Sequence, residues 1–496
     1  MQQLNRKTKT AKILALVFSF LVIPLLLLLL AVYPAGAETP KHYTELTFPP
    51  VPEIKLPNYS RFQLKNGMVV YLIEDHELPL VSGTALIRTG DRLEPGDKVG
   101  LAGTTGQVLR SGGTLKRSAD QLNQFLEQRA ASVETGIGET SGSASFNALS
   151  EDLEPVFDVF AEILRQPAFP QDKLDLSKTQ QRGNIARRND NPGGITSREF
   201  AKLVYGDTSP YARIPEYATL DNISRQDLVT FYQQYFSPNN MILGIVGDFD
   251  SKALRSLIEA RLGDWQAASS GKSALPEVTQ AKTGGVFLVN QPQLTQSNIQ
   301  IGHLGGLVKS PDYPALTVMN EVLNGFGGRL FNEIRSRQGL AYSVYAAWQP
   351  QFDYPGLFVA GGQTRSDATV PFIKSVFTEL EKIRTAPITS TELAFAKDSV
   401  LNSFIFNFQD PSQYLGRLLR YEYYGYPLDF IFRYRKAVET TTIADVQRVA
   451  KTYLQPEKMV TLVVGNEAQI NPPLSSLNPR VKVTTIDVTI PPARQS

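Results

Sequence analysis

The most informative absence in this sequence is cysteine, of which the 496 residues contain none. No disulfide can therefore stabilise the chain, and its folded parts must rely on buried cores. Histidine is nearly absent as well, since His42, His76 and His303 are the only three and stand far apart. Without thiols or a histidine pair at helical i, i+4 spacing, a zinc site in this chain is not expected. We interpret each histidine as a surface or loop residue.

An excess of charge of either sign is also missing, because the formal net charge is only +2. The first 37 residues hold four basic residues and no acidic ones, so their removal would change the formal charge to −2. This balance gives no indication of a nucleic-acid partner. A nucleotide site is not expected either, because "GLAGTTG" (100–106) lacks the Lys-Ser/Thr pair of a phosphate-binding loop.

A long hydrophobic run occurs near the N-terminus. Basic residues precede an apolar segment over 13–32, and Ala35-Gly36-Ala37 then matches the small-residue pattern of a signal-peptidase site. We interpret residues 1–37 as an export signal cleaved after Ala37. The alternative is an uncleaved membrane anchor, since about twenty apolar residues can span a bilayer. Both predict an exported protein, either periplasmic or membrane-anchored and facing the periplasm.

An internal repeat gives the domain organisation. "DLVTFYQQYFSPNNMILGIVGD" (227–248) aligns without a gap to "DVQRVAKTYLQPEKMVTLVVGN" (445–466), with Tyr235 matching Tyr453 and Gly247 matching Gly465. Each copy predicts a helix, a proline turn and a buried strand. We therefore expect two homologous domains over 45–265 and 285–470, a linker over 266–284 and a proline-rich tail over 471–496.

The order of predicted elements indicates the fold class. Each half opens with strands, including a hairpin turn at Asn66-Gly67, and continues with long amphipathic helices and a late strand. This order predicts an α+β protein whose two halves each pack helices on one face of a mainly antiparallel sheet.

Several segments together resemble a known family. "TGDRLEP" followed by "GLA", then "RNDNP", and above all "GGRLFNEIRSRQGLAYSVY" (327–345) resemble the pitrilysin, insulinase and mitochondrial-processing-peptidase family of zinc peptidases. The resemblance covers nearly the whole exported chain and implies a clamshell-type architecture around a chamber.

The resemblance also implies that a metal site has been lost. Active members carry H-x-x-E-H directly after "GLA", where this chain has Gly103, Gly106 and Gln107. A further glutamate ligand is implied near Gly183 or Asn184, and no carboxylate stands there. We accordingly expect no metal or other cofactor in this chain and no peptide hydrolysis by it alone.

The second half keeps a different part of the family's active site. In the family, an arginine and a tyrosine seven residues apart hydrogen-bond the substrate carbonyl, and they match Arg335 and Tyr342. Gly339 between them predicts a helix end that lets the two side chains converge. Taken on spacing alone, Arg335 in a surface ion pair and Tyr342 as a buried strand aromatic is the ordinary alternative. Arg329 matches the motif's other arginine, which we interpret as structural.

The resemblance implies two competing functions. Some bacterial members are heterodimers in which one chain holds zinc and a sister chain supplies the Arg/Tyr pair to the peptide substrate, and this chain resembles the second kind. The alternative is a pseudo-peptidase that acts only as a scaffold. The family's peptides add as a strand to a sheet edge, and we identify 139–150 as the candidate edge strand, with a plain β-hairpin arm as the alternative.

Overall fold

The computed structural model describes residues 54, 56–268, 274–325, 327–478 and 482–492. The described residues from Leu56 onward group into one compact unit. The predicted signal or anchor over 1–37 and His42 lie outside the described residues. Among the helices of the described ranges, none has both the length and the apolar character needed to cross a bilayer.

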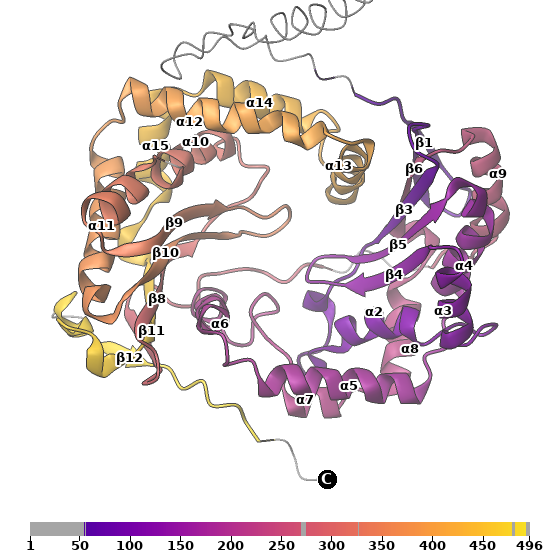
Figure 1. Cartoon of the computed structure of the whole chain (residues 1–496), viewed down its shortest axis with the longest axis horizontal. Helices are drawn as coiled ribbons and strands as arrows, with labels where there is room; N and C mark the ends of the chain where they lie inside the picture. The colour runs from indigo at the N-terminus through magenta and orange to yellow at the C-terminus, as the bar shows by residue number, and fades with distance from the viewer. Residues whose placement is uncertain (1–53, 55, 269–273, 326, 479–481, 493–496) are drawn as a thin grey trace, which may run out of the picture. The chain divides into compact units, whose positions relative to one another are not determined.

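Two six-stranded sheets organise the chain, one in the first half (residues 56–268) and one in the second half (residues 285–492) (Figure 1). The first sheet has the order β1-β2-β6-β3-β5-β4 and the second has β12-β7-β11-β8-β10-β9. In the first sheet only the β2–β6 pair is parallel. In the second, the parallel pairs are β7–β11 and β7–β12. The strands are β1 Ser60–Gln63, β2 Val69–Glu74, β3 Leu80–Ile87, β4 Ser132–Ile137, β5 Gly142–Leu149, β6 Met241–Gly247, β7 Val286–Asn290, β8 Gln296–Leu304, β9 Ala341–Gln349, β10 Leu357–Arg365, β11 Val460–Gly465 and β12 Val483–Thr485.

The helices follow the strands in the order that the sequence predicts. Those of the first half are α2 Leu101–Ser111, α3 Ala119–Glu127, α4 Leu153–Arg165, α5 Gln171–Ala186, α6 Pro192–Tyr205, α7 Tyr217–Asp221, α8 Arg225–Tyr235 and α9 Ser251–Leu262. Those of the second half are α10 Tyr313–Asn324, the π-helix η6 Phe331–Arg337, α11 Thr369–Thr385, α12 Ser390–Ser403, α13 Pro411–Tyr424, α14 Phe430–Thr440 and α15 Ile443–Tyr453. The predicted α+β class with two similar halves is confirmed.

Alternation along the strands directs apolar side chains to both faces of each sheet. On β6, Leu243 and Ile245 belong to the core beneath the helices of the first half, whereas Ile242 and Val246 point to the opposite face. Successive strand residues face opposite sides, so a sheet with apolar residues at every position must be covered twice. Every residue of β6, and every residue of its counterpart β11, is indeed buried.

The second covering layer of each sheet is a helix from the other half. Helix α13 places Leu415, Leu418 and Leu419 against Ile242 and Val246 of the first sheet. Helix α6 packs its own apolar residues, Phe200 and Val204 among them, against β8 and β11 of the second sheet (Figure 1). The prediction of helices on one face is therefore correct for each half taken alone, and the exchanged helices complete the two sheets.

The internal repeat corresponds to one structural unit in each half. Helices α8 and α15 both have 11 residues and begin with a capping box, Ser224 with Asp227 and Thr442 with Asp445. Each is followed by a short 3-10 turn, over 238–240 and 456–458, and then by β6 or β11. Both strands have one parallel and one antiparallel neighbour. The predicted limits of the two domains are not tested by this correspondence and stay a prediction.

Part of the predicted tail belongs to the second sheet. Strand β12 pairs in parallel with β7, and the amide of Ile486 donates to the carbonyl of Leu288 at 2.8 Å. Ile486 and Val488 then pack beside α6. The described end of the chain is thus held against both the sheet and the helix that the first half contributes to it.

Candidate functional site

Helix α2 carries the positions where the resemblance implies a zinc motif. Gly100, at φ 104°, precedes the helix. The buried carboxylate of Glu94 caps it by accepting from the amides of Gly100 (2.9 Å) and Ala102 (2.8 Å). Burial raises the pKa of Glu94 to about 7, against the lowering effect of the two amide donors. This carboxylate therefore organises the start of the helix.

The three motif positions have three different surroundings. A Cβ built on Gly103 would meet no atom within 4 Å, so that position is open. A Cβ on Gly106 would lie 2.5 Å from the amide nitrogen of Ile137 and 2.8 Å from the carbonyl carbon of Gly136, both on or beside the edge strand β4. Glycine at 106 is what lets α2 rest directly on β4, and the glutamate of the family motif would not fit there without a shift of the strand.

The third position, Gln107, is engaged in side-chain contacts with α5. Its amide group donates to Gln180 Oε1 at 2.7 Å and its carbonyl accepts from Ser177 Oγ at 2.6 Å. Gly183 and Asn184, near the end of α5, are exposed and supply no carboxylate. In the described part of the chain, no group of three His, Cys, Asp or Glu residues could hold a metal ion. Amides and hydroxyls are not the donor set of catalytic zinc, so these residues do not fit the metal.

The histidines correct one prediction. His76 is exposed and its Nδ1 lies 2.6 Å from Asp248 Oδ1, as expected of a surface residue. His303, however, is buried on β8, where its Nδ1 bonds the carbonyl of Leu304 and its Nε2 accepts from the amide of Gln455. The prediction of a surface or loop position is wrong for His303, because β8 lies between β11 and β10 inside the second sheet and His303 is buried there.

Arg335 and Tyr342 converge in the second half. Arg335 lies on the π-helix η6, and the turn at Gly339 (φ 61°) leads directly into β9, which carries Tyr342. The guanidinium carbon of Arg335 lies 5.0 Å from the ring centroid of Tyr342 and 4.9 Å from that of Phe331. The two side chains are thus held together by cation–π contacts rather than by a hydrogen bond.

Both members of this pair can reach a ligand. Tyr342 is 80% exposed, and the described residues include no hydrogen-bond or ion-pair partner for the Arg335 guanidinium or the Tyr342 hydroxyl. The alternative interpretation, a surface ion pair and a buried aromatic, does not describe them. A π-helix adds one residue to a helical turn and is frequent at functional sites. Sequence spacing could not have indicated the π-helix, although Gly339 indicated its end.

Arg329 has the structural surroundings that the sequence suggests. Its guanidinium makes two bonds to the carboxylate of Glu392 at the start of α12, at 2.7 and 3.2 Å. Burial opposes ionisation of Glu392, but the bonds from Arg329 and Thr389 hold the pKa of this carboxyl below its usual value. A bidentate pair of this kind fixes the start of η6 against α12.

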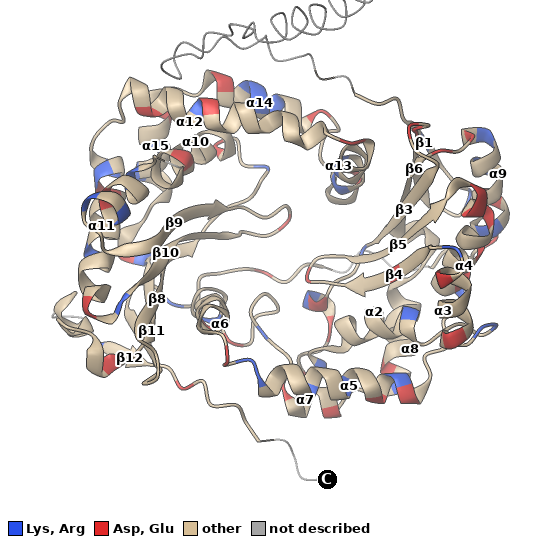
Figure 2. Ribbon diagram, viewed as in Figure 1, with Lys and Arg blue, Asp and Glu red and all other residues tan. Residues whose placement is uncertain are grey.

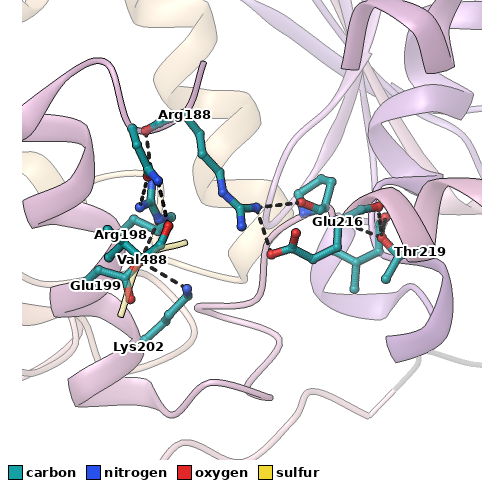
Figure 3. A network of polar contacts seen from close by, with 10 residues as sticks. Arg188, Arg198, Glu199, Lys202, Glu216, Thr219 and Val488 are labelled. Atoms are coloured by element: carbon teal, nitrogen blue, oxygen red, sulfur yellow. Dashed lines mark hydrogen bonds and ion pairs between the residues drawn. The ribbon is translucent and has the colours of Figure 1, made fainter. Parts of the chain in front are cut away.

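Two other segments of the family resemblance form contacts that hold the fold. Arg92 of "TGDRLEP" is buried and makes two bonds to Asp353 of the second half, at 3.0 and 2.7 Å. In "RNDNP", Arg188 bonds Glu216, and Asn189 donates to the carbonyl of Val488 and accepts from Arg198 (Figure 3). Arg92 thus connects the two halves. Arg188 and Asn189 connect the end of α5 to the start of α7, to α6 and to the C-terminal segment.

The predicted edge strand is a second correction. Residues 142–149 form β5, which lies between β3 and β4, so the edge-strand interpretation of 139–150 is wrong. The hairpin alternative describes it correctly, since β4 and β5 pair in antiparallel fashion. The edges on this side of the two sheets are β4 and β9. Edge β4 is approached by α2 at Gly106, and the amides of Ala346 and Trp348 on β9 are taken by Asn324 and Asn320 of α10.

Comparison with known proteins gives a consistent assignment. The family model "Insulinase (Peptidase family M16)" matches residues 69–206, and "Peptidase M16 inactive domain" matches residues 222–400. The chain is 22% identical to the "Uncharacterized zinc protease YmxG" of Bacillus subtilis, over 72% of this chain and 86% of that protein. It is 23% identical to the "Non-peptidase homolog YmxG" of Helicobacter pylori, over 79% of this chain and 91% of that protein.

A solved structure agrees with this result. The "peptidase M16 inactive domain" of Pseudomonas fluorescens has a TM-score of 0.74 and 25% identity to this chain, covering 82% of this chain and 98% of that one. Helix α2 lies in the first of the two matched ranges, and Arg335 and Tyr342 lie in the second. The chain therefore belongs to the insulinase family, peptidase family M16, and is similar to members of it that are described as inactive.

Proposed function

We propose that this chain is the non-catalytic, substrate-clamping subunit of a heteromeric zinc metallopeptidase. In this proposal a homologous partner chain with an intact H-x-x-E-H motif holds the zinc and hydrolyses the peptide. The observation that carries the proposal is the contrast between the two halves. The first half has no residue that could serve at its zinc-motif positions, whereas Arg335 and Tyr342 remain together, exposed and unpaired among the described residues.

The chemistry of peptide hydrolysis gives this pair a use. Hydrolysis of a peptide bond develops negative charge on the oxygen of the scissile carbonyl, and donors fixed beside that oxygen stabilise the transition state. The partner's zinc would supply the activation of the attacking water. A guanidinium supplies several N–H donors in a rigid plane and a phenol supplies one O–H donor. Stacking between Arg335 and Tyr342 at 5.0 Å limits the freedom of both side chains before a substrate arrives.

The packing of α2 supports a function in which substrate binding and catalysis are shared between two chains. Because α2 rests on β4 at Gly106, the first half has no room for the missing glutamate, and we expect catalysis to take place on the partner. The purified chain should hold no stoichiometric zinc and should hydrolyse no peptide by itself. One tightly bound zinc per chain in elemental analysis would contradict this.

We also propose that the protein acts outside the cytoplasm. The support is the sequence of residues 1–37, with basic residues before the apolar run over 13–32 and Ala35-Gly36-Ala37 after it. In this proposal the protein is periplasmic if the segment is cleaved, or anchored by residues 13–32 and facing the periplasm if it is not. Mass spectrometry of the N-terminus of the mature protein would distinguish the two forms.

The experiment that tests the proposed function is reconstitution. The exported chain is mixed with a homologous chain from the same genome that carries H-x-x-E-H, and the mixture is separated by size before assay. We expect a complex with peptidase activity that neither chain shows alone. A complex whose activity does not exceed that of the zinc-bearing chain would contradict the clamp and would favour the second function, a scaffold without a part in hydrolysis.

A further inference from the structure

A pocket of about 420 Å³ lies between the first sheet and α13. Neither Arg335 nor Tyr342 is among the residues that line it. Its walls come from both halves: β3 and β6 on one side, α13 and the residues around Phe352 on the other. Its lining includes Ser82, Thr84, Gly244, Gly416 and Arg420. Pockets of this size are typical of sites for small ligands and for short peptide segments.

Small residues on both walls create this space. Ser82 and Thr84 alternate on β3 with Val81, Gly83 and Ala85, so their hydroxyl groups face away from the main core. On α13, Ser412, Gly416 and Arg420 follow one another at four-residue spacing and therefore share one helix face. A Cβ built on Gly416 would meet no atom within 4 Å. The pocket is consequently hydroxyl-lined and open at the centre of the helix.

One positive charge stands in this lining without a counterion. Arg420 is the single charged residue among the described residues that line the pocket, and Figure 2 shows the neighbouring strands β3 and β5 without acidic or basic residues. Its guanidinium carbon lies 5.7 Å from the ring centroid of Phe352, which stacks on Tyr424 at 4.8 Å. No carboxylate in the described part of the chain pairs with it.

The acidic residues that neighbour Phe352 and Arg420 in the sequence are already paired. Asp353, next to Phe352, is bound by both terminal nitrogens of Arg92. Glu422, two residues after Arg420, accepts from Arg61 at 2.8 Å and from the Tyr71 hydroxyl at 2.7 Å. The guanidinium of Arg420 is therefore held by an aromatic ring, beside hydroxyl groups, with its N–H donors free for a ligand.

We propose that this pocket binds the carboxylate of a peptide, through Arg420, with the peptide backbone against Ser82 and Thr84. The inference rests on the proposed function, because it adds a second contact with the same peptide substrate. Arg335 and Tyr342 bind the scissile carbonyl, and this pocket binds a carboxylate elsewhere on the peptide. An arginine pairs with a carboxylate through two parallel bonds, which gives both strength and orientation. The Ser82 hydroxyl donates to Asn147 Oδ1 at 2.6 Å and can still accept from a backbone amide, whereas the Thr84 hydroxyl can donate or accept. Both can therefore hold a peptide backbone without selecting its side chains.

The test measures binding to the full exported chain alone, by isothermal titration calorimetry. Three N-acetylated peptides of alanine, serine and glycine are compared: one with a free C-terminal carboxylate, one with a C-terminal amide, and one with the amide and a single internal glutamate. A hydrogen-bonded ion pair is worth enough to make the free acid bind about tenfold or more tightly than the neutral amide. The glutamate peptide shows whether a side-chain carboxylate serves equally well.

Two variants test whether the preference for the free acid arises in this pocket. Arg420→Gln should abolish the difference between the acid and the amide. Gly416→Leu should weaken every peptide by filling the space, and its Cβ has room, so the fold should be kept. Gly183→Leu is the matched control, because Gly183 is also an exposed helical glycine with no atom within 4 Å of a built Cβ. Circular dichroism confirms that each variant is folded.

The outcomes separate this inference from the proposed function. Equal or undetectable binding of the acid and the amide, or a preference that survives Arg420→Gln, overturns the pocket assignment whatever the reconstituted complex does. A preference that depends on Arg420 supports the pocket even when reconstitution yields no peptidase activity, because no partner chain is present in the binding experiment.

Discussion

The two halves of the molecule share one topology and differ at the positions that the family resemblance assigns to an active site. Their sheets have the same order apart from the edge strands β1 and β12, and the repeat units α8–β6 and α15–β11 correspond element by element. In the first half the positions of the zinc motif hold glycine, glycine and glutamine. In the second half a π-helix presents Arg335 beside Tyr342. The shared topology therefore does not require the residues of the zinc motif.

The contacts of α2 explain why the loss is tolerated. Its buried residues, Leu101, Val108 and Leu109 among them, belong to the core of the first half. The motif positions lie on other faces, one of them open and one against β4. A helix held by its apolar face can lose polar functional residues at little cost, since burial of apolar surface supplies most of its stability.

The exchanged helices give the sharpest contrast between the halves, and we expect the largest effects there. Gly244 of β6 faces Leu419 of α13, whereas Leu462, at the equivalent repeat position of β11, is fully buried against α6. Leu462→Ala should lower the free energy of unfolding by about 2–5 kcal/mol because it leaves a cavity. Gly244→Ala adds an atom 2.8 and 2.9 Å from the two methyl groups of Leu419 and 3.0 Å from one of Leu415. These are the movable ends of side chains, so the substitution should cost only about 1 kcal/mol. Urea unfolding measures both, and equal losses would contradict the comparison.

A second test restores the family motif in the first half. Gly103→His, Gly106→Glu and Gln107→His together should give a less stable protein that binds no tight zinc. The reasons are that no carboxylate lies near Gly183 to complete the ligand set and that a side chain at 106 collides with the backbone of β4. Elemental analysis and a peptidase assay of the triple variant check this. Stoichiometric zinc with activity would show that another residue of α5 already serves as a ligand.

Single substitutions within α2 isolate the collision. Gly106→Ala should lower the free energy of unfolding by about 1–3 kcal/mol, since its Cβ would lie 2.5 Å from a backbone nitrogen. Gly103→Ala, in the same helix and open to solvent, should raise it by roughly 0.5–1 kcal/mol through helix propensity. Thermal or urea unfolding measures the two variants side by side. The same sign for both would mean that α2 does not rest on β4 as described.

The two histidines provide the smallest and most selective difference. Burial lowers the pKa of His303, so the unfolded chain takes up a proton at a higher pH than the folded chain, and stability is lost as pH falls below about 6.5. His303→Gln should reduce the loss of stability between neutral pH and pH about 5. Asp248 raises the pKa of exposed His76, so protonation of His76 adds stability as pH falls, which is opposite to the effect of His303. His76→Gln should therefore leave the loss of stability at low pH unchanged or make it slightly larger. Urea midpoints against pH test this, and equal slopes for wild type and His303→Gln would contradict it.

The repeat made much of this fold predictable. Periodicity and the aligned segments indicated α8, β6, α15 and β11 correctly, and Asn66-Gly67 indicated the β1–β2 hairpin. The position of a strand within a sheet is different, because it depends on pairing with residues far along the chain. Small residues made 139–150 resemble an edge, yet β4 pairs outside it. The apolar residues of α6 and α13 likewise show that these helices are amphipathic without showing which sheet they cover.

The site was predictable only where a motif carried it. The family resemblance located Arg335 and Tyr342, and Gly339 indicated the helix end between them, but the cation–π contact depends on a π-helix that no spacing reveals. Gly106 is important because it lies directly against β4, and this close approach cannot be read from the sequence. Arg420 belongs to no recognisable sequence motif. That it has no carboxylate partner becomes evident only when the structure shows Asp353 bound to Arg92 and Glu422 bound to Arg61.

The central claim is that Arg335 and Tyr342 act on a substrate held by a zinc-bearing partner, and the turnover of the reconstituted complex tests it most directly. With complex formation verified by sizing and zinc content by elemental analysis, Tyr342→Phe and Arg335→Ala should each lower kcat and kcat/KM about 10²–10³-fold. Arg337→Ala is the control, since this arginine lies on the same π-helix but pairs with Glu333, and it should leave kcat unchanged. Full activity of both variants in an intact, zinc-loaded complex would contradict the clamp and establish the chain as a scaffold.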